Sequence, residues 1–138
     1  MRKQTVVALF IATVAAAFGV VAIAAEPGGD SVKPVQNQKL PDVPGKKVVM
    51  AEVTYEPGGK SEAHRHQGSV FAYVLEGEII SQLGDEPPVT YKAGDSWYET
   101  PLIPHRISRN ASATKPAKLL AILVLDENGA IKEPLPKK

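Results

Sequence analysis

Turn-forming residues interrupt the chain at short intervals from Lys46 onward, and this spacing constrains the fold more than any other feature of the sequence. The stretches between the turns are too short for helices of ordinary length, and they are rich in β-branched and aromatic residues. We therefore expect an all-β domain, built as a sandwich or a barrel. The turns lie at Pro57-Gly58-Gly59, Glu76-Gly77, Gly84-Asp85, Pro87-Pro88, Gly94-Asp95, Pro101, Pro104 and Asn110.

Seven segments bounded by these turns are expected to be strands. The last of them, extended to residue 125, is apolar throughout and fits either one helical turn or a strand buried on both faces. Its length of seven residues and its lack of capping residues favour the strand. The expected strands are residues 48–55, 69–75, 78–83, 89–91, 95–98, 106–109 and 119–124.

Residues 1–24 are expected to be a secretory signal peptide that is not part of the fold. Arg2 and Lys3 precede an uncharged run from residue 6 to residue 25, and cleavage is expected after Ala24, with Ala25 as the second choice. The alternative is an uncleaved anchor, because about 20 apolar residues suffice to span a bilayer. We expect the mature protein to be periplasmic or secreted, with membrane contact only through an uncleaved leader.

Residues 25–45 form a segment rich in proline and glycine that precedes the domain expected at residues 46–138. This segment contains four prolines and three glycines but few large apolar side chains. We expect an extended arm here, either a tether or a strand-like arm laid over the domain, with partial disorder.

The charges of the chain nearly balance, and cysteine is absent. Sixteen Lys and Arg residues against fifteen Asp and Glu residues give a formal net charge of +1, and no Lys/Arg run exceeds two residues. This balance disfavours a nucleic-acid partner bound by phosphate neutralisation. The absence of cysteine excludes a disulfide scaffold, a thiol nucleophile and a Cys-ligated metal site.

The three histidines of the chain, His64, His66 and His105, are its best candidates for metal ligands. Residues i and i+2 of a strand share one face, so His64 and His66 are placed to chelate one divalent ion. His105 would arrive from another strand and complete a set of three. The spacing by itself leaves a surface or hydrogen-bonded core role open for each histidine.

Two regions of the sequence resemble the motifs of the cupin superfamily, and all three histidines lie on the family's ligand positions. Sixteen residues separate the two regions. The resemblance implies a cupin-type double-stranded β-helix, or jelly-roll barrel. The matching residues of the first motif are Gly58, His64, His66 and Gly77, and those of the second are Gly94, Pro101, Pro104, His105 and Asn110.

The chain departs from the family pattern at three positions. Asn110 lies one residue late, and Leu102 stands where the family has glycine. More important for chemistry, Val70 occupies the position of the family's ligating glutamate. The resemblance therefore implies a three-histidine metal site without that carboxylate.

A site of this kind looks like that of the cupin dioxygenases that hold ferrous iron with three histidines. We expect a divalent metal cofactor, with Fe²⁺ favoured and Zn²⁺, Ni²⁺ or Mn²⁺ as alternatives. The expected function is that of a dioxygenase-type oxidoreductase acting on a small organic substrate. Two alternatives stay open, a nonenzymatic protein that binds a metal or small ligand, and a degenerate barrel without metal.

Two glutamates are weaker candidates for catalytic residues. Glu62 shares a strand face with His64 if that strand extends back, where it could act as an acid, a base or a substitute ligand, and a solvated turn residue is the alternative. Glu99 approaches His105 in sequence and either enters the mouth of the barrel or lies on its rim.

Four aromatic side chains could line a pocket for an aromatic ligand, or else supply packing or a dimer face. Short exposed edge strands favour pairing between two copies of the chain, so we expect a homodimer. The four aromatic residues are Phe71, Tyr73, Trp97 and Tyr98.

Overall fold

The computed structural model describes residues 29–136 of the 138-residue chain, and the expected leader, residues 1–24, lies outside the described residues. Within residues 29–136 no helix is long and apolar enough to cross a membrane. The described residues form ten strands, which are β1 (Asp30–Lys39), β2 (Lys46–Tyr55), β3 (His64–Arg65), β4 (Ser69–Glu76), β5 (Glu78–Leu83), β6 (Val89–Lys92), β7 (Ser96–Glu99), β8 (His105–Asn110), β9 (Ala117–Asp126) and β10 (Glu133–Pro134).

The all-β expectation is confirmed, and each of the seven expected segments is a strand within two residues of its expected ends. The apolar segment 119–125 lies within β9, which confirms the strand and not the helical turn. No residue of β9 before Asp126 is exposed, and the strand lies at the centre of its sheet with a partner on either side.

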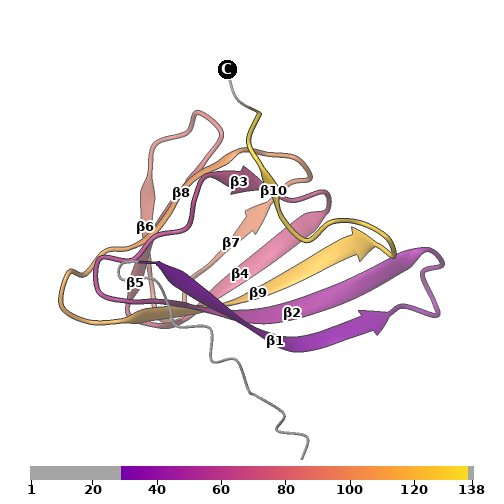
Figure 1. Cartoon of the computed structure of the whole chain (residues 1–138), viewed down its shortest axis with the longest axis horizontal. Coiled ribbons are helices and arrows are strands. Elements are labelled where there is room, and N and C mark those ends of the chain that lie inside the picture. The colour runs from indigo at the N-terminus through magenta and orange to yellow at the C-terminus, as the bar shows by residue number, and fades with distance from the viewer. Residues whose placement is uncertain (1–28, 137–138) are drawn as a thin grey trace, which may run out of the picture.

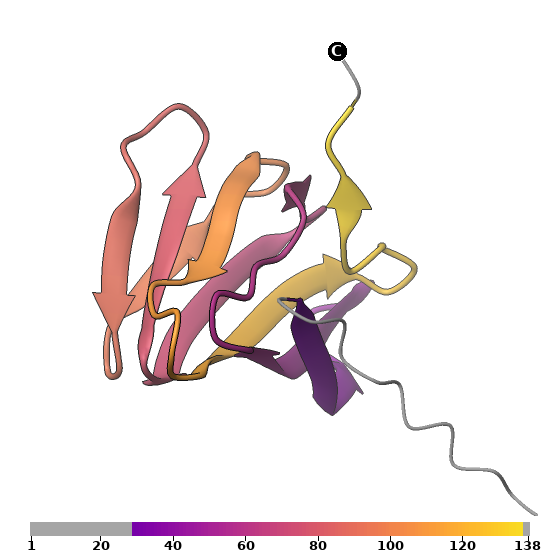
Figure 2. The same ribbon diagram turned by 60° about the vertical axis from the view of Figure 1, so that its left-hand side comes forward.

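The strands form two antiparallel five-stranded sheets that face each other (Figures 1 and 2). Sheet A has the strand order β1-β2-β9-β4-β7, and sheet B has the order β10-β3-β8-β5-β6. The jelly-roll expectation is thus confirmed as a β-sandwich, in which the described strands do not close into a continuous barrel. Closure needs a continuous hydrogen-bonded ladder, and the strands β3 and β10 on one side of sheet B have only two residues each.

The segment expected as an arm contains β1, which pairs antiparallel with β2 along the edge of sheet A. The register runs from Asp30 opposite Tyr55 to Lys39 opposite Lys47, with an irregularity between Pro34 and Gln36. Proline within a sheet is largely confined to edge strands such as this one, where an N–H can face solvent instead of a neighbouring strand. The side chains of β1 beyond Asp30 are exposed, so this strand adds sheet hydrogen bonds but little core.

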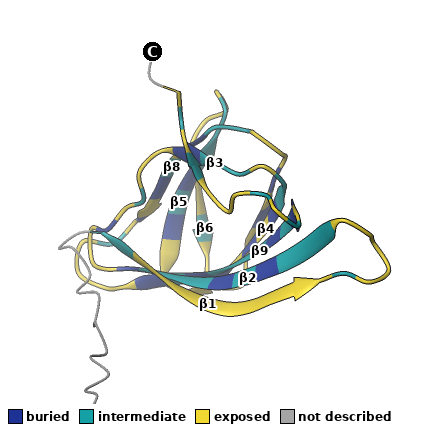
Figure 3. Ribbon diagram, turned by 45° about the vertical axis from the view of Figure 1, so that its right-hand side comes forward, coloured by how far each residue is buried: buried dark blue, intermediate teal, exposed yellow. Residues whose placement is uncertain are grey.

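The core lies between the sheets and follows from the two-residue period of the strands. On β4, Val70, Ala72 and Val74 are buried, whereas the alternating Phe71 and Tyr73 are exposed (Figure 3). Several inward-facing residues of sheet A are small, and they leave a cavity between the sheets. The alanines that line this cavity are Ala51, Ala72 and Ala121.

Candidate metal centre

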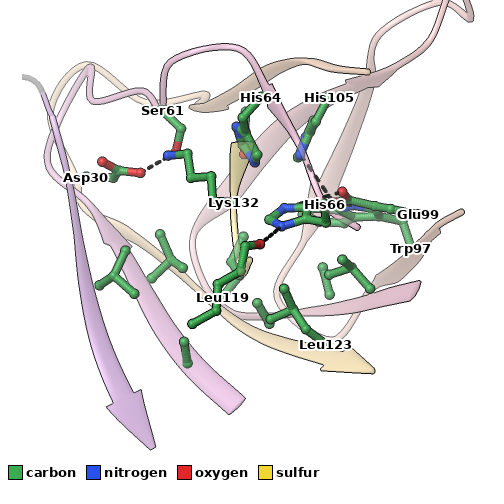
Figure 4. A pocket seen from close by; sticks show the side chains of 18 of the residues that line it. Asp30, Ser61, His64, His66, Trp97, Glu99, His105, Leu119, Leu123 and Lys132 are labelled. Carbon is green, nitrogen blue, oxygen red and sulfur yellow. Dashed lines mark hydrogen bonds and ion pairs between the residues drawn. The ribbon is translucent and has the colours of Figure 1, made fainter. Parts of the chain in front are cut away.

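The fold brings all three histidines to one end of the space between the sheets (Figure 4). His64 on β3 is paired directly opposite His105 on β8, and His66 follows immediately after β3. The ring centroid of His64 lies 4.8 Å from that of His66 and 5.0 Å from that of His105. One ring nitrogen from each histidine lies within 4.8 Å of the others, so the three are positioned to bind a metal ion.

Hydrogen bonds determine which ring nitrogens are available to a metal. Nδ1 of His64 donates to the Glu62 carbonyl at 2.7 Å, and Nδ1 of His66 donates to the Ile131 carbonyl. A carbonyl only accepts, so in both rings Nδ1 carries the proton and Nε2 keeps its lone pair. In His105 the Nε2 atom lies 2.9 Å from the Ser81 hydroxyl, which can accept its proton and leave Nδ1 as the free atom.

Burial keeps these imidazoles in the neutral form that binds metals. Loss of solvation lowers the pKa of His64 to about 4 and the pKa of His105 to about 3, and it also lowers the pKa of His66. The lowered pKa values therefore favour the neutral imidazoles at neutral pH, each with one N–H and one free lone pair. A cation entering the site would displace no protons from them.

Glu99, expected either inside the barrel mouth or on its rim, lies in the interior beside the histidines. Glu99 is only 3% exposed, and its Oε1 atom accepts a hydrogen bond from Trp97 Nε1 at 2.9 Å. The same Oε1 lies 3.2 Å from His105 Nδ1, and Oε2 lies 3.8 Å from His66 Nε2. Burial raises the pKa of Glu99 to about 7.

Two polar atoms at this point have no hydrogen-bond partner within residues 29–136. They are Oε2 of Glu99 and Nδ1 of His105, and both are buried. Buried polar atoms in folded proteins are nearly always satisfied, so such a pair demands an explanation, for which a bound ion is one of the standard candidates. The donor set present here, imidazole nitrogens and one carboxylate oxygen, fits a divalent first-row metal.

Glu62 contributes to the site through its backbone and not through its side chain. Its carbonyl accepts a hydrogen bond from His64, but the residue is exposed and lines a separate surface groove together with residues of β8. The Glu62 side chain thus lies in an exposed loop and does not line the cavity. Of the four aromatic candidates only Trp97 lines the cavity, because the other three point to the outer face of sheet A.

The cavity beside the histidines has a volume of about 100 Å³ and two different walls. The inner face of sheet A supplies an apolar wall, and the histidines with Glu99 supply the polar one. At the other end Ser61 donates to the Asp30 carboxylate, and Lys132 lines the cavity nearby (Figure 4). The apolar wall includes Val53, Val70, Ala72, Leu119, Ala121 and Leu123.

Sequence reasoning missed three contributors to this site. Ser81 faces His105 from β5, and the carbonyl of Ile131 and the side chain of Lys132 come from the segment before β10. β10 pairs with β3, which brings this late segment against the histidines. No local pattern in the sequence signals that pairing, since the two strands are about 70 residues apart and two residues long.

Residues 51–123 match the cupin domain family, and the chain therefore belongs to it. Solved structures agree with this assignment. The protein TT1209 from Thermus thermophilus is similar over 80% of this chain and 89% of its own, with 26% identity and a TM-score of 0.56. A cupin-like protein from Thermotoga maritima is similar over 68% of this chain and 67% of its own, with 24% identity and a TM-score of 0.54.

A further structural neighbour is the DMSP lyase DddQ from Ruegeria pomeroyi, with 22% identity and a TM-score of 0.54. The likeness covers 60% of this chain but only 41% of the lyase, and at this identity it shows the fold alone. No curated protein matches the chain significantly.

Proposed function

We propose that this chain is an exported, metal-dependent oxidoreductase of the dioxygenase type. His64, His66 and His105 hold the metal, with Fe²⁺ favoured over Zn²⁺, Ni²⁺ or Mn²⁺. The observation that carries the proposal is the convergence of three neutral imidazoles, each with a free lone pair, on one end of a cavity with an apolar wall. Ferrous iron bound there would supply the one-electron chemistry that O₂ requires.

The residues around the metal site have separate tasks. The carbonyls of Glu62 and Ile131 and the hydroxyl of Ser81 hold the three rings in orientation and fix their protons on the side away from the cavity. The apolar wall of sheet A lowers the polarity around the metal site, which strengthens the electrostatic interactions there.

The cavity supports a small organic substrate that bears an anionic oxygen. Lys132 lines the cavity, and its positive charge contributes to the lowered pKa of all three histidines. A negative group on the substrate would be attracted both to this ammonium and to a bound cation. We propose that such a group orients the substrate, while the apolar wall contacts its carbon skeleton.

The test of this proposal is metal content, measured by mass spectrometry on protein purified without chelator. We expect about one metal ion per chain in the wild type and none in the His64→Ala/His66→Ala variant. Glu76→Gln is the matched control, because this side chain is exposed at the end of β4, outside the cavity, and its change should leave the metal content unaltered. Absence of stoichiometric metal, even after reloading with ferrous, nickel, manganese and zinc salts, would refute the proposal.

Nitric oxide binding to the iron-loaded protein separates an enzyme from a metal-binding protein without activity. An open coordination position should give an electron paramagnetic resonance signal on addition of nitric oxide, whereas a saturated site should give none.

Export is tested on the full-length chain, expressed with its leader. Its intact mass should correspond to a chain that begins at Ala25.

A further inference from the structure

We propose that Glu99 is a fourth ligand of the metal, binding through Oε2 from strand β7. This inference rests on the proposed metal centre, but it does not depend on which reaction the centre performs. It concerns a residue that the three-histidine interpretation leaves without a role.

The distances between the donor atoms suit a shared ion. Two atoms that each bind one ion at about 2.1 Å lie roughly 3.0–3.4 Å apart when the angle between them is between 90° and the tetrahedral value. The carboxylate of Glu99 lies 3.2 Å from His105 Nδ1 through one oxygen and 3.8 Å from His66 Nε2 through the other. Small side-chain rotations would bring these atoms onto one ion.

The hydrogen bonds of the carboxylate leave one particular oxygen for the metal. Trp97 Nε1 donates to Oε1 and so holds the group in orientation. Oε2 is buried and has no hydrogen-bond partner in the described part of the chain, and the same is true of His105 Nδ1. A divalent ion between these two atoms would satisfy both at once.

The register of sheet A explains how a carboxylate reaches this position. Glu99 on β7 is paired directly opposite Val70 on β4, and both residues are buried on the inner face of the sheet. Trp97 points inward like Glu99, because the two are separated by one full strand period, and Tyr98 between them points outward. Val70 on β4 thus stands where the family has its ligating glutamate, and Glu99 on the neighbouring strand β7 supplies a carboxylate beside it.

A carboxylate ligand also changes the charge of the centre. Three imidazoles leave the full charge of +2 on a bound divalent ion, and ionised Glu99 would reduce it to +1. An oxygen donor added to nitrogen donors suits iron and manganese better than it suits softer ions.

The experiment is a titration of the metal-free protein with Co²⁺, whose visible absorption reports the number and kind of its ligands. We expect Glu99→Gln to weaken Co²⁺ binding by about 10-fold or more and to change the spectrum. The glutamine keeps the shape of the side chain and an oxygen for Trp97, so the variant should fold, and thermal unfolding of the metal-free protein checks this. Glu76→Gln is the matched control, because Glu76 is exposed at the end of β4 and does not line the cavity, and it should retain both affinity and spectrum.

The outcomes separate this inference from the proposed metal centre. A wild type that binds no Co²⁺ would overturn both. A wild type that binds Co²⁺, together with a Glu99→Gln variant of equal affinity and unchanged spectrum, would overturn only the role of Glu99. Should the variant not fold, a crystal structure of the zinc-loaded wild type decides, since a ligating Oε2 must lie about 2.0–2.2 Å from the ion.

Discussion

Leu102 shows how a single residue near the site holds an unfavourable backbone conformation. Its φ is 64°, in the left-handed region, and its N–H donates at 2.8 Å to the carbonyl of His66. A side chain with a Cβ adopts this region at a penalty of roughly 1–2 kcal/mol. The hydrogen bond ties the loop before β8 to the backbone of a metal-site histidine, so the strain lies where it helps to position a functional group.

We expect Leu102→Gly to stabilise the protein by about 0.5–1 kcal/mol, because glycine removes the steric penalty but also makes the unfolded chain more flexible. Little packing is lost, since Leu102 is half exposed. Urea unfolding of the metal-free protein measures the change. Leu102→Ala is the control, because it shortens the side chain yet keeps the penalty, and it should not stabilise. Equal stability of the glycine and alanine variants would contradict the explanation.

At the scale of elements, a buried hydroxyl network joins the two sheets. Tyr55 lies at the end of β2 in sheet A, and its hydroxyl lies 2.6 Å from Ser108 Oγ on β8 in sheet B. It also lies 3.0 Å from Ser61 Oγ in the loop before β3. Burial raises the pKa of Tyr55 above its ordinary value of 10.0, so the folded state holds the phenol proton more tightly than the unfolded state does.

This network predicts a loss of stability at alkaline pH. The contribution of Tyr55 is fully present below pH 10 and decreases as the pH rises toward the raised folded pKa, by at most about 1.4 kcal/mol per pH unit. Tyr55→Phe should remove this pH dependence, at a penalty of about 1–3 kcal/mol at neutral pH, because the buried Ser108 hydroxyl loses its partner. Urea unfolding of both proteins across the alkaline range measures the two slopes. Identical slopes would show that Tyr55 is not responsible.

At the scale of the whole molecule, the outer face of sheet A is unusually apolar for an exposed surface. Phe71, Tyr73 and Tyr98 are each about half exposed, with exposed fractions of 50%, 46% and 46%. The rings of Phe71 and Tyr98 contact each other, with centroids 5.1 Å apart. Clustered exposed aromatic side chains of this kind are typical of protein–protein contacts.

We therefore expect a homodimer in which two copies pack through this face of sheet A. Light scattering after size exclusion should give twice the mass of one chain for the wild type, and the mass of one chain for a Phe71→Ser/Tyr98→Ser variant. Val89→Ser serves as the control, because Val89 is exposed on sheet B, away from this face. A wild type that is monomeric at high micromolar concentration would contradict the expectation.

The local sequence was sufficient to predict the class of fold, seven of the eight strands that have four or more residues, and the three histidines that the structure brings together. Each of these depends on features that neighbouring residues carry, which are the spacing of turns, the two-residue period of strands and the scarcity of histidine. The motif resemblance added the family, which the comparisons confirmed.

Tertiary structure alone decided the rest, and the reason is the register between strands that are distant in the chain. Nothing near Glu99 in the sequence shows that it lies opposite Val70, and nothing near Lys132 shows that β10 pairs with β3. The open edges of the sandwich likewise depend on where the ladders end. A one-residue change of register would turn a strand's inward side chains outward, so the identity of the groups facing the histidines is a property of the assembled sheets.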